Sequence, residues 1–191
     1  MKKVLVFLAD GFETIEALSV VDVCHRAKVI CHACSIADNK EVKSAHGTTV
    51  LCDKVISEND LDSYDAIVLP GGMPGATNLR DNEVVQGLIK KYNEDGKIVA
   101  AICAAPIALA KAGVIEGKNV TSYPGFEDQL GNVNYVEDEC VVVDGNIITS
   151  RGPATALAFG LEILKELGYE KEANQIREGM LINFFIEKES K

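Results

Sequence analysis

Two features are missing from this 191-residue sequence: a long apolar run and an excess of basic residues. No apolar stretch reaches the roughly 20 residues that a membrane-spanning helix needs. Lysine and arginine together number 19 against 29 acidic residues, which gives a net charge of −10. This charge repels phosphate backbones and anionic lipid surfaces, so it argues against nucleic-acid binding and membrane association.

Cysteine is also scarce. The six cysteines in the chain are too few for a disulfide scaffold. We therefore expect reduced thiols. Cys31 and Cys34 have the spacing of a redox or zinc motif, but they lie in a β-like run, 29–36, where residues three apart point to opposite faces. His25 and His32 have no cysteine or carboxylate array around them at metal-ligand spacing. The sequence predicts no metal site.

The composition that remains is typical of a soluble protein, with 47% apolar and 25% charged residues. It excludes a disordered, collagen-like or coiled-coil chain. The length fits one packed core, and no internal repeat, linker or low-complexity tract divides the chain, so we expect a single domain over residues 1–191. The N-terminal stretch lacks a small-residue cleavage site, and we expect a cytoplasmic protein.

Short β-branched runs alternate with longer helical patterns, which is typical of parallel strands joined by helices. The Asp144-Gly145 pair between two strand-like runs predicts an antiparallel hairpin. These patterns predict a flavodoxin-like doubly wound α/β sandwich, with a mostly parallel central sheet, helices on both faces and a small antiparallel hairpin. The predicted strands are 4–9, 29–36 and 66–70, the predicted helices are 14–28, 82–95, 154–168 and 170–182, and a strand–elbow–helix is predicted over 98–113.

Three segments carry candidate site residues at the carboxyl ends of the strands, where ligand sites of such sheets lie. In the first, Cys103 stands between a buried strand and a helix that begins with small residues, which is a nucleophile elbow with cysteine in place of serine. The helix N-terminus is expected to lower the pKa of this thiol and favour the thiolate, and the next N–H points at a developing oxyanion. On this segment alone, a buried structural cysteine is the favoured interpretation, because small residues around a cysteine are common.

The other two segments supply a glycine-rich turn and a carboxyl. Gly71 and Gly72 lie in the turn 69–75, whose N–H groups can line an oxyanion pocket, although an ordinary strand-to-helix loop has the same composition. Glu16 lies about one turn into the first helix and points toward the same edge. Beside a thiolate its pKa should rise, so that it stays protonated and donates to the sulfur. An exposed acid on the helix dipole is the alternative.

In this order and at this separation, the segments strongly resemble the ThiJ/PfpI superfamily, in particular its parkinsonism-associated protein deglycase branch. The resemblance runs through nearly the whole chain. It rests on GFETIEA (11–17), VVDVCHRA (20–27), YDAIVLPGGMPGA (64–76), AAICAAP (100–106) and TSRGPATA (149–156). It implies that Cys103 is the reactive cysteine, that Glu16 faces it, and that the N–H groups of Gly72 and Ala104 are the oxyanion donors.

The resemblance also implies a homodimer, in which Arg26 and His46 belong to a contact region where a basic residue of one subunit approaches the site of the other. His46 stands where an arginine is often found, and histidine changes charge near neutral pH. Tyr123 occupies the place of a histidine that many relatives carry, while His25, His32 and His46 lie far upstream. A protease-like Cys-His-acid triad is therefore not expected, although Tyr123 can still donate a hydrogen bond.

Three functional hypotheses follow. The resemblance implies a cofactor-independent enzyme of deglycase or glyoxalase III type, in which Cys103 attacks a dicarbonyl or its early adduct on protein or nucleotide amino groups, and Glu16 moves the proton. The second hypothesis is an oxidative-stress sensor and chaperone, in which peroxide oxidises Cys103 to the sulfinic acid. The third is a thiazole-phosphate biosynthesis scaffold, which the lack of a phosphate-binding glycine motif with an adjacent lysine weakens.

Overall fold

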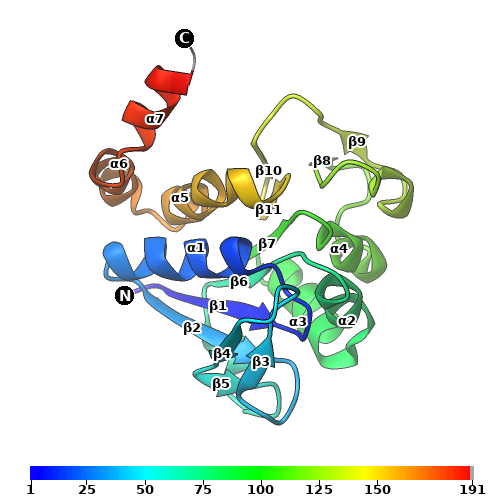
Figure 1. The fold of residues 1–191 in the computed structure, drawn as a ribbon. Helices are drawn as coiled ribbons and strands as arrows, with labels where there is room; N and C mark the ends of the chain where they lie inside the picture. Colours follow the sequence, from blue (N-terminus) through cyan, green and yellow to red (C-terminus); the bar gives the residue numbers. More distant parts are fainter. Residues whose placement is uncertain (190–191) are drawn as a thin grey trace.

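A seven-stranded sheet forms the centre of the computed structural model, which describes residues 1–189 (Figure 1). Its strand order is β10-β11-β7-β6-β1-β2-β5, and neighbouring strands are parallel except for the antiparallel pair β10 and β11. The predicted sheet and its hairpin are confirmed. The strands are β1 (Lys3–Leu8), β2 (Ile30–Ser35), β5 (Lys54–Val55), β6 (Ala66–Leu69), β7 (Ile98–Ile102), β10 (Val141–Asp144) and β11 (Ile147–Ser150).

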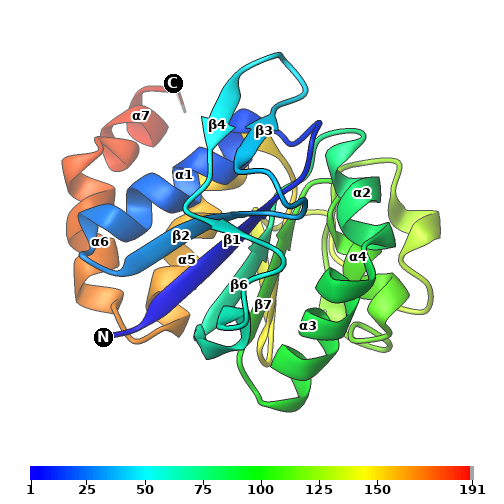
Figure 2. The same cartoon turned by 90° about the horizontal axis from the view of Figure 1, so that it is seen from below.

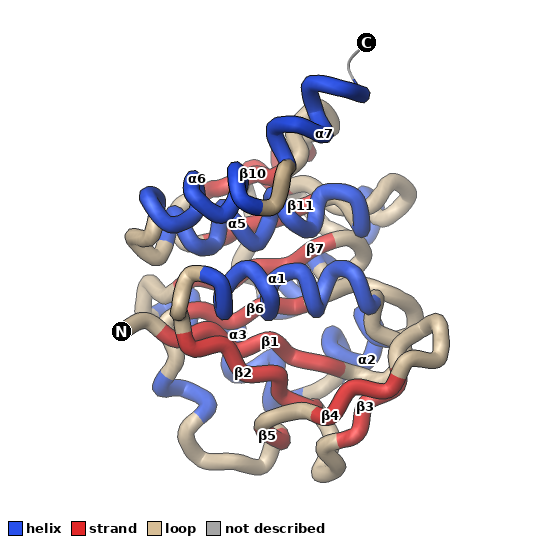
Figure 3. The backbone as a smooth tube through the Cα atoms, turned by 60° about the vertical axis from the view of Figure 1, so that its left-hand side comes forward, coloured by secondary structure: helices blue, strands red, loops and turns tan. Residues whose placement is uncertain are grey.

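Helices cover both faces of the sheet, as the predicted doubly wound fold requires (Figure 2). On one face lie α1 (Thr14–Arg26), α5 (Ala156–Glu166) and α6 (Glu170–Gly179). On the other lie α2 (Gly75–Asp81), α3 (Glu83–Glu94) and α4 (Pro106–Ala112). The last helix, α7 (Ile182–Glu189), extends away from the body of the molecule beyond α6 (Figure 3).

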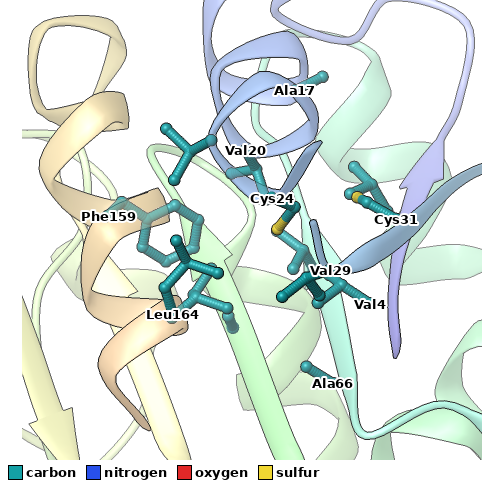
Figure 4. Close-up of a cluster of buried hydrophobic side chains, with 14 of the residues drawn as sticks. Val4, Ala17, Val20, Cys24, Val29, Cys31, Ala66, Phe159 and Leu164 are labelled. Atoms are coloured by element: carbon teal, nitrogen blue, oxygen red, sulfur yellow. The ribbon is translucent and has the colours of Figure 1, made fainter. Parts of the chain in front are cut away.

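The central strands are buried on both faces, which explains their continuous apolar runs. Side chains therefore alternate between two cores: Cys31 packs on the α1 side and Cys34 on the other side, as predicted for residues three apart in a strand. Figure 4 shows Cys24 and Cys31 in the first core, on the same side of the sheet as Phe159 of α5. All six cysteines are unpaired in the described part of the chain.

Three parts of the observed fold differ from the predicted elements. The turn after β6 continues directly into α2, which was not predicted. The predicted helix 170–182 ends at Gly179, because Leu181 adopts a φ of 60° that a right-handed helix does not allow, and α7 begins after it. The region between β2 and β6 contains a hairpin of β3 (Glu41–Lys43) and β4 (Thr49–Leu51), whose short strands gave no clear pattern.

Short elements complete the described chain. A two-stranded parallel pair is formed by β8 (Asn119–Val120) and β9 (Asn134–Tyr135). Single 3-10 turns lie at Leu61–Ser63, Glu127–Gln129 and Pro153–Thr155. Within residues 1–189, no helix combines the length and the apolar character needed to cross a bilayer.

Candidate functional site

The three candidate segments meet at one edge of the sheet, beyond the carboxyl ends of β1, β6 and β7. The N–H of Glu13 donates to the carbonyl of Gly71 at 2.9 Å, and the N–H of Gly71 donates to Glu16 Oε2 at 2.7 Å. A Cβ placed on Gly71 would lie 2.7 Å from Cys103 Cβ. Residues that are distant in sequence therefore form one compact site, as the parallel-sheet rule predicts.

Cys103 lies on a strained turn between β7 and α4. Its φ is +65°, a conformation that residues other than glycine rarely adopt. Two backbone hydrogen bonds of 2.9 Å hold it there: its N–H donates to the carbonyl of Ser150, and its carbonyl accepts from the N–H of Tyr123. The side chain is partly exposed. The elbow geometry predicted from the sequence is thus present, and β11 and the segment after β8 hold it in place.

Glu16 projects from the first turn of α1 and is fully buried. Oε2 accepts the hydrogen bond from Gly71, and Oε1 has no hydrogen-bond partner of ordinary geometry. Burial raises the pKa of Glu16 to about 7, although hydrogen bonding to Cys103 and Gly71 lowers it. The negative charge of Glu13 adds to the rise in this pKa. Glu16 is therefore the buried, weakly acidic group predicted at this position.

The pKa of the Cys103 thiol differs from the predicted one. Burial, followed by the charge and hydrogen bond of the adjacent Glu16 carboxyl, raises its pKa to about 12. The N–H groups of Ala104 and Gly72 act in the opposite direction and lower the pKa of the thiol, but by less than burial raises it. The predicted lowering of the Cys103 pKa is wrong, because partial burial beside the Glu16 carboxyl raises this pKa by more than the backbone N–H groups lower it.

Cys103 and Glu16 are close enough to titrate as a pair. One proton leaves the pair near neutral pH and the second is retained far into the alkaline range. Near pH 7 the pair is therefore about half deprotonated, and above that pH it carries one negative charge and one proton. The proton can reside on the carboxyl, which leaves a thiolate, or on the sulfur, which leaves a carboxylate.

Gly71 and Gly72 have no room for a side chain. A Cβ on Gly71 would lie 2.8 Å from Glu16 Oε2, and one on Gly72 would overlap the backbone of Glu13. Gly72 also has a φ of +86°. The two glycines allow the turn after β6 to lie directly against the thiol and the carboxyl, with the Gly72 N–H facing the sulfur.

The remaining predicted residues lie at different distances from this centre. Tyr123 is adjacent to Cys103 through its backbone, and its exposed ring lies against Gly152. Arg26 lies at the other end of α1, about 15 Å along the helix from Glu16, where it pairs with Asp22 at 2.7 Å. The structure does not bring Arg26 to the site of its own chain.

His46 is far from the other site residues in sequence but not in space. Its Nδ1 lies 3.4 Å from Glu13 Oε2, at the rim of the site. Sequence reasoning assigned no role to Glu13, although its place just before a helix is typical of an N-cap, and its side chain accepts from the N–H of Ile15. Sequence reasoning also assigned no role to Ser150 of the TSRGPATA segment, whose carbonyl accepts the N–H of Cys103.

Within residues 1–189, no group of three or more His, Cys, Asp or Glu side chains is arranged to hold a metal ion.

Comparison with known sequences gives consistent matches. A protein-family model described as the DJ-1/PfpI family matches residues 2–166. Protein dj-1beta of Drosophila melanogaster is 39% identical over 184 residues, which cover 96% of this chain and 98% of that protein. A Pyrococcus abyssi protein named as a deglycase is 40% identical over 169 residues, which cover 86% of this chain and 99% of that protein.

Solved structures agree with these matches. The crystal structure of Drosophila melanogaster DJ-1beta superposes with a TM-score of 0.91 at 39% identity, and the match covers 94% of this chain and 97% of that one. Toxoplasma gondii DJ-1, described as oxidized, gives a TM-score of 0.88 at 35% identity over 95% of this chain and 98% of that one.

Proposed function

Because this chain belongs to the DJ-1/PfpI family, we propose that it is a cofactor-independent enzyme that uses Cys103 to act on reactive dicarbonyls such as methylglyoxal, or on their early adducts with amino groups. The proposal is carried by one observation: a partly exposed thiol on a strained turn lies beside a fully buried carboxyl whose pKa is about 7. A neighbouring base of this strength assists the nucleophilic attack of a thiol on an aldehyde.

In the first step, Glu16 takes the proton from Cys103 while the sulfur forms a bond to the aldehyde carbon. The N–H groups of Gly72 and Ala104 face the sulfur and are placed to stabilise the alkoxide that forms next to it. Glu16 then gives its proton to this oxygen, which produces a hemithioacetal. An early adduct on an amino group is a carbinolamine. The sulfur forms its bond to the carbon that carries the nitrogen, the C–N bond breaks, and the proton taken by Glu16 goes to the leaving amine, so the same hemithioacetal results.

In the second step, Glu16, again a carboxylate, removes the proton from the carbon bonded to sulfur, which gives an enediol. It returns this proton to the neighbouring carbon, while the hydroxyl proton of the hemithioacetal moves to the former ketone oxygen. The product is a thioester of a 2-hydroxy acid. Water hydrolyses this thioester, which releases lactate from methylglyoxal and restores the thiol. The sum is methylglyoxal plus water to lactate, so no external oxidant or reductant is consumed. A base with a pKa near 7 suits both directions of proton transfer.

Lactate formation from methylglyoxal tests this proposal. We expect lactate from the purified protein, none above background from Cys103→Ser, and a loss of about 100-fold or more in Glu16→Gln, because general acid–base catalysis typically contributes at least that factor. Cys140→Ser is the matched control, since Cys140 is exposed and outside the site. Equal consumption of methylglyoxal by Cys103→Ser and the parent protein would refute the proposal.

A second candidate function is peroxide sensing at the same sulfur. It is favoured by the position of Glu16, whose protonated form can donate to the oxygens of a sulfinic acid on Cys103. Mild peroxide treatment followed by peptide mapping tests it. We expect two oxygens on Cys103 before any change at the exposed Cys140 or the buried Cys31. Oxidation of Cys140 first would contradict the sensing function.

A further inference from the structure

The segment TSRGPATA, residues 149–156, is part of the family resemblance, and the proposed chemistry does not use its side chains. It leads from the end of β11 through the turn Pro153–Thr155 into α5. The paired residues of β7 and β11 end with Ile102 and Ser150. The N–H of Cys103 donates to the carbonyl of Ser150 at 2.9 Å. This hydrogen bond therefore lies just beyond the end of the β7–β11 ladder.

The place of this hydrogen bond makes it important for the elbow. Cys103 has left the extended conformation of β7, because its φ is +65°. A residue keeps such a strained conformation only where its surroundings fix it. The pairing of β11 with β7 ends at Ser150, so the direction of the Ser150 carbonyl depends on contacts outside the ladder.

Two hydroxyl groups supply such contacts. The Ser150 side chain is fully buried, and its Oγ lies 2.7 Å from the carbonyl oxygen of Cys140 and 2.7 Å from Thr155 Oγ1. Thr155 Oγ1 lies 3.1 Å from the nitrogen of Gly152 and 2.9 Å from its carbonyl oxygen. Ser150 is thus held by the residue before β10 on one side and by the turn before α5 on the other.

The number of protons gives these contacts a direction. Each hydroxyl has one proton to donate. The Gly152 carbonyl already accepts the N–H of Thr155 at 2.9 Å, so it does not need the Thr155 hydroxyl. Ser150 therefore donates to the carbonyl of Cys140, and Thr155 donates to Ser150. The N–H of Gly152 donates to Thr155. We call this continuous series, from Gly152 through Thr155 and Ser150 to Cys140, the hydroxyl chain.

We propose that Ser150 and Thr155 are positioning residues, whose hydroxyl chain holds the strained turn of Cys103 in its reactive geometry. This inference rests on the proposed function in that it takes Cys103 as the reactive residue. In this geometry, a Cβ placed on Gly71 would lie 2.7 Å from Cys103 Cβ and 2.8 Å from Glu16 Oε2. The thiol and the carboxyl therefore flank the same glycine. A change in the direction of the Ser150 carbonyl turns the sulfur away from Glu16.

The expected effect is a change in the reactivity of the Cys103 thiol within the folded protein. Beside Glu16, the pair loses its first proton near pH 7. A thiol that has turned away from this carboxyl ionises nearer to the ordinary thiol pKa of about 8.5. In Ser150→Ala and in Thr155→Val, we expect the midpoint of Cys103 alkylation against pH to rise by about 1 unit. The alkylation rate at pH 7 should then fall about fivefold.

The experiment measures alkylation of Cys103 against pH in the whole chain, with the modified peptide identified by mass spectrometry. Urea unfolding gives the stability of each variant. Ser35→Ala is the matched control, because Ser35 is the fully buried last residue of β2 and its Oγ accepts the N–H of Ala37 at 3.2 Å. We expect this control to alkylate like the parent protein, even where its stability falls. Thr155→Ser keeps the hydroxyl and should retain the parental profile.

A double variant tests whether the two hydroxyls act as one chain. Ser150→Ala already interrupts the chain, so adding Thr155→Val should raise the alkylation midpoint no further. Contacts that act independently would instead give a shift equal to the sum of the two single shifts. Thr155→Val and Thr155→Ser carry the test if Ser150→Ala does not fold.

Two results would overturn the inference. One is an alkylation midpoint within about 0.2 unit of the parent protein in the variants that lack a hydroxyl, even where their stability falls. The hydroxyls would then only support the β10–β11 hairpin. The other is the additive shift in the double variant. Alkylation requires no dicarbonyl, so a protein that shows the expected shifts but forms no lactate would refute the proposed function and leave the positioning role standing.

Discussion

Ionisation of the buried Glu16 carboxyl makes the free energy of unfolding depend on pH. Its pKa is about 7 when folded, against 4.5 for an ordinary glutamate, so the folded state binds this proton more tightly than the unfolded state. The resulting stabilisation is complete below pH 4.5 and is lost as pH rises toward 7. The loss amounts to about 3 kcal/mol for this fully buried group.

We therefore predict that Glu16→Gln is more stable than the parent protein at pH 8, by up to about 3 kcal/mol, and gains little at pH 4.5. Glutamine keeps an oxygen for the Gly71 N–H and has no charge to bury. Urea unfolding at both pH values measures the difference, with the exposed Glu94→Gln as control. Equal stability of Glu16→Gln and the parent protein at pH 8 would show that Glu16 ionises without cost.

The sequence predicted the pKa shift of Glu16 better than that of the Cys103 thiol. Glu16 was expected to be partly buried beside the thiol, with an exposed acid on the helix dipole as the alternative. The observed burial of Glu16 decides between the two, and the rise in its pKa follows from it. The lowering expected for Cys103 rested on the dipole of α4 and on two N–H groups. These donors are present, but the burial of the sulfur and the adjacent carboxyl depend on packing that local sequence does not encode.

At the scale of elements, the elbow depends on how β11 holds the segment after β8. Thr149 Oγ1 accepts from the N–H of Thr121 at 2.9 Å, and both residues are fully buried. Two residues further along, the N–H of Tyr123 donates to the carbonyl of Cys103. The hydroxyl of Thr149 therefore helps to fix the segment that supports the strained turn.

Thr149→Val should destabilise the protein by about 1–3 kcal/mol, because it leaves the N–H of Thr121 buried without an acceptor. It should also change the alkylation rate of Cys103, since the support from Tyr123 is loosened. Urea unfolding and alkylation measure the two effects. Thr149→Ser keeps the hydroxyl and should behave like the parent protein. A Thr149→Val variant with parental stability would contradict this role.

The elements that sequence patterns located are those whose signals are local. β1, β7 and α4 have long apolar runs or a glycine stop, and Gly113 indeed ends α4 with a φ of +76°. The helix α2 was missed because it has only seven residues and begins inside a turn rich in glycine and proline. The β3–β4 hairpin was missed because docking on the loop before α1, rather than its own sequence, holds it in place.

For the whole molecule, the resemblance that assigned Arg26 to a contact region predicts a homodimer. The outer face of α1 is consistent with a contact surface, because Ile15 and Leu18 are 55% and 36% exposed. Light scattering after size exclusion should give twice the 20.5 kDa of one chain. Leu18→Glu should shift the protein toward the single-chain mass, and the exposed Val84→Glu on α3 should not. A parent protein that elutes as a single chain would rule out the dimer.

The site as a whole was predictable to the extent that topology determines it. Parallel strands bring their carboxyl ends to one edge, so Glu16, Gly71 and Cys103 were expected together before their contacts were known. The contact of His46 with Glu13 was not expected, because it joins a hairpin turn to a helix cap through backbone docking. Such contacts depend on tertiary structure that no local pattern reveals.

The crowding around Gly71 has a consequence for laboratory evolution of this protein. Any side chain at position 71 or 72 would collide with the reacting groups or with backbone, so libraries that randomise the turn after β6 should return glycine there. New substrate preference must then arise at exposed positions near these groups, such as Met73, which follows Gly72 in the chain, and Tyr123, whose N–H donates to the carbonyl of Cys103. The chemistry and the choice of substrate are therefore separable targets for mutation in this scaffold.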